Sequence, residues 1–367
     1  MLTKADDFPI HQTPDPAAFA GTDRNFYDRY FFNGYNPNGS EFFALAFGTY
    51  PNINIADAHF SVVRGGVQYC LHGSRVLHME RMDLRVGPIA IEVTEPLRRL
   101  HIRVDGEGIT ADLRFEGRAF PVQEPRFTHR IGPRSFMDYT RMTQNGRWTG
   151  WIEIDGDRRV LSGTAVGTRD RSWGIRPIGA ADPQPIAPPV RPSFFWLWAP
   201  LNFADFSVFF HVNADDRGRP WNTRAVLCPD GAECSDMLHC ANPRMEITWQ
   251  EGLRHAAHAV LHADFPGRPM EIAFSPFVAP AIGGPARFQM RGIGYPGSSW
   301  PHGGYKGELV VAREDFRLDE ADPEGMENLH IQAPCRVTAL EANGPDQRGI
   351  GVLEQLVMGT YAPYGFA

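Results

Sequence analysis

The stretch Gly163-Thr-Ala-Val-Gly-Thr-Arg169-Asp170-Arg171-Ser172-Trp173-Gly174-Ile175-Arg176-Pro177 joins a strand-like segment to a dense group of charged side chains. In a strand, side chains alternate between two faces, so the carboxylate of Asp170 is expected to point away from Arg169 and Arg171. Gly174 is expected to let the chain turn sharply after Trp173. We predict that this stretch is the last strand of a first β-domain.

The residues before this stretch show the alternation of apolar and polar side chains that is typical of β-strands. Residues 89–94, 100–105 and 109–115 alternate in this way and are separated by short turns. A further hairpin is predicted around Asp155-Gly156, with strands at 147–156 and 159–168. These patterns predict an antiparallel β-meander.

A break in the pattern separates two halves of the chain. Residues 177–192 contain six prolines in sixteen positions, which prevents regular strand pairing and forbids a helix interior. Length also favours two domains. We therefore predict an N-terminal arm at 1–40 with one short helix at 23–32, a first β-domain at 41–178, a connector at 179–192 and a second β-domain at 193–367.

The second half begins with an aromatic run at residues 193–211 that contains almost no charge. It predicts two strands around a bend at 200–204, buried on both faces. Further strand-like segments follow at intervals of about ten residues, the spacing of sandwiches and barrels. The second domain is therefore expected to be all-β as well.

Composition narrows the classes of partner. The chain has 367 residues, with 36 basic and 43 acidic side chains and a net charge of −7, and the basic residues form no run that would bind nucleic acid. We see no secretory signal and no apolar window long enough to cross a membrane, so we expect a cytoplasmic protein. The five cysteines are expected to be free thiols.

Asp170 is the first candidate for chemistry. If it is buried, desolvation raises the pKa of its carboxyl and keeps a proton available for acid catalysis, while the ring face of Trp173 could stabilise a developing cation. The alternative is a structural salt bridge from Asp170 to an arginine, with Trp173 plugging the end of a barrel. The sequence leaves both interpretations open.

Three further residues are candidates with alternatives of their own. His302 lies in a loop between Pro301 and a pair of glycines, where backbone can approach a ligand, with Trp300 and Tyr305 as walls. His211 ends an aromatic strand, where a structural role is more common. Glu354 lies in an apolar strand and is expected either to pair with a buried arginine or to face a cavity.

Motif searches remove several classes of enzyme. The chain contains no Gly-x-Gly-x-x-Gly loop between a strand and a helix, no Walker loop, no Gly-x-Ser-x-Gly elbow and no His-Glu-x-x-His pair. His255 and His258 are three residues apart, so in a strand they point to opposite faces. We expect no cofactor and no metal.

The segment 169–177, the Gly-Tyr…Trp-Pro-His-Gly-Gly loop at 294–304 and the closing Glu354-Gln355 strand resemble the AttH-like superfamily, which includes hydroxyneurosporene synthase, also called carotenoid hydratase. The resemblance implies two consecutive lipocalin-like antiparallel β-barrels with little helix. It also implies alkene hydration in a hydrophobic molecule, with Asp170 as proton donor and Trp173 as the ring that faces the cation. The hydratase pattern is closer to Asp-His-x-Trp, and this chain has Arg171 in place of that histidine.

The sequence hypothesis is a hydro-lyase of secondary metabolism that acts on a terpenoid, steroid or polyketide-like substrate, and a homodimer is left open. Water addition, or the reverse dehydration, would use His302 or His211. The pocket would be lined by Trp173, Trp196, Trp198, Trp300 and Tyr305, and Arg169 and Arg176 would fix Asp170 or a polar end of the ligand. The alternatives are a cyclase or isomerase that works through pocket shape, and a lipocalin-like carrier without chemistry.

Overall fold

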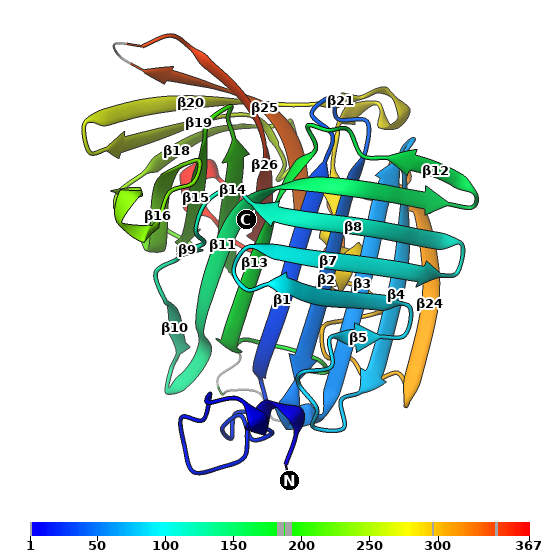
Figure 1. Cartoon of the computed structure of the whole chain (residues 1–367). Helices are drawn as coiled ribbons and strands as arrows, with labels where there is room; N and C mark the ends of the chain where they lie inside the picture. Colours follow the sequence, from blue (N-terminus) through cyan, green and yellow to red (C-terminus); the bar gives the residue numbers. More distant parts are fainter. Residues whose placement is uncertain (1, 182–186, 188–192, 296, 342–343) are drawn as a thin grey trace.

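The chain folds into two antiparallel β-sheets that pack face to face (Figure 1). This computed structural model describes residues 2–181, 187, 193–295, 297–341 and 344–367. Within these residues the helical elements are short 3-10 turns, and all named strand pairs are antiparallel. The predicted all-β class is confirmed: one sheet forms a near-closed barrel, and the other forms a half-barrel rather than a second closed barrel.

The larger sheet curls so that β6, β7 and β8 cross in front of β1 to β4 (Figure 1). In the described part of the chain it contains 14 strands, in the order β24-β4-β3-β2-β1-β13-β11-β8-β7-β6-β5, with β9, β10 and β12 paired to β11. Its strands are β1 (Phe26–Tyr35), β2 (Phe42–Tyr50), β3 (Ile55–Arg64), β4 (Val67–Val76), β5 (Arg85–Val86), β6 (Ile89–Glu95), β7 (Arg99–Gly106), β8 (Ile109–Gly117), β9 (Val122–Gln123), β10 (Phe127–Ile131), β11 (Arg134–Ile154), β12 (Asp157–Val160), β13 (Val166–Ile175) and β24 (Leu309–Arg317).

The smaller sheet has the order β17-β16-β15-β14-β26-β25-β20-β19-β18, with β23 paired to β25. Its strands are β14 (Phe194–Asn202), β15 (Phe206–Ala214), β16 (Pro220–Pro229), β17 (Leu238–Cys240), β18 (Arg244–Trp249), β19 (Ala256–Phe265), β20 (Arg268–Pro276), β23 (Phe288–Gln289), β25 (Ile331–Glu341) and β26 (Gln347–Met358). The remaining elements are the ribbon β21 (Val278–Ala279) with β22 (Gly284–Pro285), and the turns η1 (Lys4–Asp7), η2 (Pro51–Ile53), η3 (Cys234–Asp236), η4 (Pro280–Ile282), η5 (Met290–Ile293) and η6 (Ala362–Tyr364).

The prediction of a helix at 23–32 is wrong, because most of this segment belongs to strand β1. Aromatic residues such as Tyr27 and Phe32 are fully buried there, on opposite faces, which a surface helix could not achieve. The predicted turn at Asp155-Gly156 is confirmed, since both residues have positive φ and connect β11 to β12. After β12 the chain leaves the sheet and returns as β13, so residues 159–168 are not one strand.

The proline-rich connector predicted at 179–192 lies mostly outside the described residues. The sheets change between β13 and β14. Strand β24 comes from the C-terminal half, yet it pairs with β4 at the edge of the larger sheet. The two halves of the chain are thus connected by this strand pairing as well as by packing of the sheets.

Three apolar layers result from this arrangement. The inside of the barrel is filled from β1 to β8 and β11, around the buried Trp148. The half-barrel has its own core, built from residues such as Phe195, Leu197 and Phe210. Between the sheets lies a third layer that includes Phe31, Trp196 and Trp198. The aromatic run of β14 therefore is buried on both faces, as predicted, because alternate residues enter the second and third layers.

Replacing Trp148 by alanine is expected to lower the free energy of unfolding by about 3–5 kcal/mol. Its ring packs against Phe115 at 5.1 Å and Phe43 at 5.2 Å, and its Nε1 donates to the Asn33 carbonyl at 2.9 Å. Urea unfolding followed by circular dichroism measures the loss. The matched control is Trp151→Ala on the same strand, because Trp151 is only partly buried; an equal loss in both variants would contradict the assignment of Trp148 to the core.

Candidate active site between the sheets

Strand β13 aims its side chains at two different layers. Asp170 pairs with Phe31 on β1 and with Thr143 on β11, so these three side chains share one face. Phe31 belongs to the layer between the sheets, which places Asp170 there too. Arg169 points the other way, beside the barrel residue Phe32. The expectation that Asp170 and its neighbouring arginine lie on opposite faces is confirmed.

Asp170 is the carboxylic acid of this layer that has no fixed partner. Among the described residues, no hydrogen bond or ion pair holds its carboxylate. Burial raises the pKa of Asp170 to about 7, while the positive charge of Arg141 opposes the shift. The nearby negative charges of Glu124 and Glu354 raise this pKa further. The residue keeps a partly accessible surface, so a protonated carboxyl is available to a bound molecule at neutral pH.

Glu124 is a second carboxylate of the site, and it is fully engaged. Arg141 donates to its Oε2 through Nε at 2.8 Å and through Nη2 at 2.5 Å, and the Thr143 hydroxyl donates to Oε1 at 2.6 Å. Burial would raise the pKa of Glu124, but Arg141 and His211 outweigh it and hold this pKa below its usual value. Glu124 is therefore an anion that neutralises Arg141.

His211 has its tautomer fixed by its surroundings. The Asn222 amide nitrogen donates to the carbonyls of Pro125 and Arg126, which orients the Asn222 Oδ1 toward the histidine. His211 Nε2 lies 2.8 Å from this oxygen and must donate its proton to it. Burial lowers the pKa of His211, so Nδ1, at 3.5 Å from a Glu124 oxygen, carries a lone pair.

Glu354 closes the other side of the site. It accepts hydrogen bonds from Trp196 Nε1 at 2.8 Å, from His330 Nε2 at 2.9 Å and from Gln332 Nε2 at 2.6 Å. Burial acts to raise the pKa of Glu354, but these donors, with His330 first, hold it below its usual value. Of the two alternatives for Glu354, a buried arginine or a cavity, no arginine pairs with it among the described residues; three other donors hold it as an anion.

Aromatic side chains separate these polar groups. The Arg141 guanidinium lies 4.6 Å from the ring centroid of Trp196 and 5.6 Å from that of Trp198. Trp198 contacts the edge of Phe31, with ring centroids 6.1 Å apart. In the smaller sheet Trp198 pairs with both His211 and Glu354. The structure therefore brings Asp170, His211, Glu354, Trp196 and Trp198 into one layer between the sheets.

His302 lies in a different part of the same interface and is fully bonded. Its Nε2 lies 3.0 Å from the Ile293 carbonyl and donates to it, while Nδ1 faces guanidinium nitrogens of Arg29 at 3.3 Å and Arg176 at 3.4 Å. Burial, followed by these two positive charges, lowers the pKa of His302 well below its usual value. It anchors its loop, and Arg176 serves this contact rather than Asp170.

The structure leaves the other predicted lining residues away from Asp170. Trp173 lies on the opposite face of β13 and is 39% exposed. Trp300 stacks on His72, with centroids 5.5 Å apart, and Tyr305 is 67% exposed. Gly174 continues the strand instead of turning it, and a Cβ there would meet the Asp138 carbonyl at 2.3 Å.

Glu124, Arg141 and His330 are the residues of the candidate site that sequence reasoning missed. Arg141 and Glu124 lie in segments whose alternation is weak, because part of β11 pairs with several strands in turn. Their charges offered a signal, because a charged side chain enters an apolar layer only when it is paired with an opposite charge. The sequence alone could not say which charges are buried.

Two general searches of the described residues complete the site. They contain no group of three or more His, Cys, Asp or Glu side chains arranged to hold a metal ion. No described helix is long and apolar enough to cross a membrane.

Comparison with known proteins gives the family. A family model described as a family of unknown function (DUF8625) matches residues 2–367. The chain belongs to this family. No curated protein matches its sequence.

Comparison with solved structures gives matches over most of the chain. A crystal structure of a protein provisionally named AttH from Nitrosomonas europaea is 13% identical, covers 95% of this chain and 98% of its own, and has a TM-score of 0.52. Kievitone hydratase from Nectria haematococca is 12% identical over 91% of this chain and 89% of its own, with a TM-score of 0.49. CghA is 12% identical over 95% and 96%, with a TM-score of 0.49. The resemblance to the AttH-like fold is confirmed by the first of these.

Replacing Asp170 by asparagine is expected to change how stability depends on pH. A carboxyl whose pKa rises from 3.8 in the unfolded chain to about 7 in the folded protein makes the folded state bind the extra proton. The stability that this proton contributes is complete below about pH 4 and is lost as the pH rises through about 7. In Asp170→Asn this loss should disappear, and urea midpoints measured from pH 4 to 8 should be flatter.

Glu124→Gln is the matched control, because the pKa of Glu124 is lowered rather than raised. It leaves the buried Arg141 without its counter-charge and should destabilise the protein by about 3–5 kcal/mol at neutral pH. If Asp170→Asn lost stability near neutral pH in the same way, Asp170 would be an ionised structural partner and the raised pKa would be wrong.

Proposed function

We propose that this protein is an enzyme that adds water to an alkene in a hydrophobic small molecule, or removes water in the reverse direction, with Asp170 as the proton donor. One observation carries the proposal. Glu124 and Glu354 are hydrogen-bonded and ionised, whereas Asp170 has no hydrogen bond or ion pair among the described residues and has a pKa raised to about 7. When the surroundings of neighbouring carboxyl groups move their pKa values apart, the group with the raised pKa can act as the acid. The groups with lowered pKa values stay anionic.

The chemistry needs few groups. Asp170 transfers its proton to one alkene carbon, and the electron pair of the double bond forms the new C–H bond. The carbocation left on the other carbon lies beside the new Asp170 carboxylate and the aromatic faces of the layer, which stabilise positive charge. Water then attacks the cation, and its proton returns to Asp170 directly or through His211 Nδ1. The balance is one water added, with no oxidant or reductant.

The surroundings of Asp170 suit an apolar substrate with a reactive double bond. Phe31 and Trp198 are each almost completely buried and offer ring surface, and the Trp198 Nε1 is buried without a hydrogen-bond partner. Arg141 is neutralised by Glu124, so it does not repel a cation as a free arginine would. The hydrogen bonds around Glu354 hold the Trp196 ring in place.

The test is turnover in water labelled with heavy oxygen. The purified protein is incubated with panels of terpenoid, steroid and polyketide-like alkenes, and products are followed by mass spectrometry for the gain of one labelled water. Asp170→Asn should reduce the rate by about a hundred-fold or more, the usual contribution of a positioned acid. Asp155→Asn, which removes an exposed carboxylate on the barrel surface, is the control and should retain activity.

Other outcomes point elsewhere. A product of unchanged mass that forms equally well in Asp170→Asn would indicate a cyclase or isomerase that works by pocket shape. A ligand recovered unchanged after long incubation would indicate a carrier. Either result would contradict the acid role of Asp170.

A further inference from the structure

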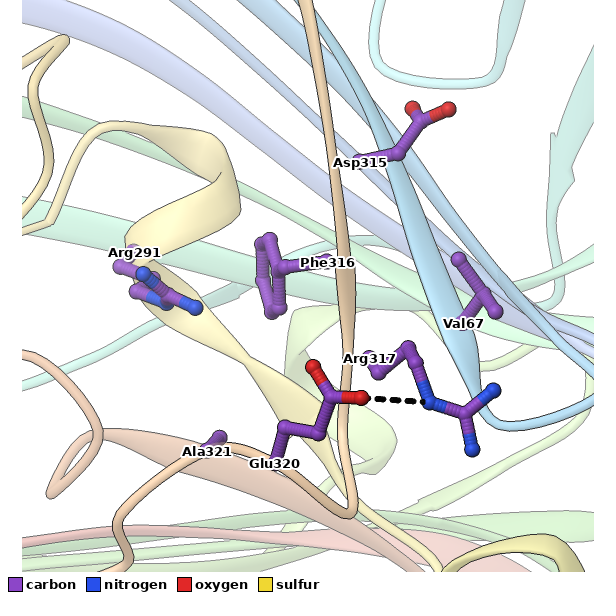
Figure 2. A pocket seen from close by; sticks show the side chains of 7 residues that line it. All are labelled: Val67, Arg291, Asp315, Phe316, Arg317, Glu320 and Ala321. Atoms are coloured by element: carbon purple, nitrogen blue, oxygen red, sulfur yellow. Dashed lines mark ion pairs between the residues drawn. The ribbon is translucent and has the colours of Figure 1, made fainter.

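A pocket of about 430 Å³ lies at the edge strand β24, on the side of the larger sheet far from β13. It is lined by Val67, Arg291, Asp315, Phe316, Arg317, Glu320 and Ala321 (Figure 2). This volume is within the range of small-molecule sites. No step proposed for Asp170 uses these residues.

The charged side chains of this pocket differ in whether they have a partner. Arg317 is held by Asp319 at 2.7 Å and by Glu320 at 3.1 Å, and Asp315 is held by Arg313 at 2.8 Å. Arg291 has no hydrogen bond or ion pair among the described residues, and its Nε is buried without a partner. Arg291 is therefore the one lining charge, within the described chain, that is left for a ligand.

The position of Arg291 is fixed by packing. Its guanidinium lies flat over the Phe316 ring, 3.8 Å from the centroid, and Figure 2 shows the two side chains on the same side of β24. Stacking of this kind covers one face of the guanidinium and leaves the N–H groups at its rim free to donate. The backbone of Arg291 belongs to the short turn η5, which limits its movement.

The N–H groups at the edge of the Arg291 guanidinium favour a carboxylate as the ligand. Two N–H groups of a guanidinium match the two oxygens of one carboxylate in a planar pair. The carboxylate of Glu320 also lines the pocket, so a singly charged ligand meets less repulsion than a doubly charged phosphate. Phe316, Val67 and Ala321 supply apolar contact for the body of the ligand. We propose that this pocket binds a small organic carboxylate with an apolar body, and that Arg291 holds its carboxylate.

Benzoate is the probe that tests the proposal, with benzyl alcohol as its uncharged analogue and inorganic phosphate as the doubly charged one. Arginine side-chain N–H signals in NMR spectra of the full chain identify Arg291 by comparison with Arg291→Gln. Benzoate should shift the Arg291 signal in a saturable way and bind about ten-fold or more weaker to Arg291→Gln. Benzyl alcohol and phosphate should bind more weakly than benzoate.

Two further variants make the result specific. Ala321→Trp fills the pocket but keeps the charge, and it should also abolish binding even if Arg291→Gln folds poorly. Asp170→Asn should leave benzoate binding unchanged, which separates this site from the one between the sheets. Unchanged affinity in Arg291→Gln or Ala321→Trp, or phosphate binding as tightly as benzoate, would overturn the proposal.

Discussion

The position of β13 between β1 and β11 is the constraint on which the candidate site depends. Around Asp170, one face of these strands packs against the barrel core and the other packs against the smaller sheet. A shift of one residue in the pairing would send Arg169 between the sheets and Asp170 into the barrel. The ten paired residues on each side of β13 hold the register. Backbone pairing, and not a flexible loop, therefore decides that Asp170 is the carboxylate between the sheets.

The distance between the sheets is set by polar contacts at the rim of the aromatic layer. Asn145 donates to the Leu201 carbonyl at 2.9 Å, and Asn33 donates to Gln332 at 3.0 Å. Arg118 reaches from the larger sheet to Asn202 at 3.1 Å. Each of these bonds is directional, so the sheets cannot slide without leaving buried groups unpaired. Asp170 lies inside this frame without a bond of its own.

Alternation and turn chemistry allowed much of the fold to be predicted from the sequence. They gave the β-class, the hairpin at Asp155-Gly156 and the double-sided burial of β14. They failed at β1, where aromatic residues spaced for a helix are equally compatible with a strand buried on both faces. They could not place β24, because pairing of an edge strand with a distant part of the chain leaves no local pattern.

The candidate site was predicted in the same uneven way. Asp170 was found because a carboxylate within a strand pattern has a definite face. Trp173 was expected beside it from proximity in sequence, although three residues along a strand lead to the opposite face. Arg141 and Glu124 come from segments without clear alternation, and their burial depends on the second sheet covering them. Partners across an interface are set by tertiary structure, which single-sequence patterns do not contain.

Burial is the main cause of the raised pKa of Asp170, and the two hydrogen-bonded carboxylates add to it. Glu124 and Glu354 are each saturated with donors, so neither can accept the proton that Asp170 holds, and both disfavour a third negative charge. The positive charge of Arg141 favours the Asp170 anion, but Arg141 makes its two carboxylate hydrogen bonds to Glu124 and only partly offsets the effect of burial. The network thus leaves Asp170 without a hydrogen-bonded counter-charge, and its pKa rises to about 7. An acid made in this way releases its proton most readily to a substrate whose developing positive charge pairs with the carboxylate left behind.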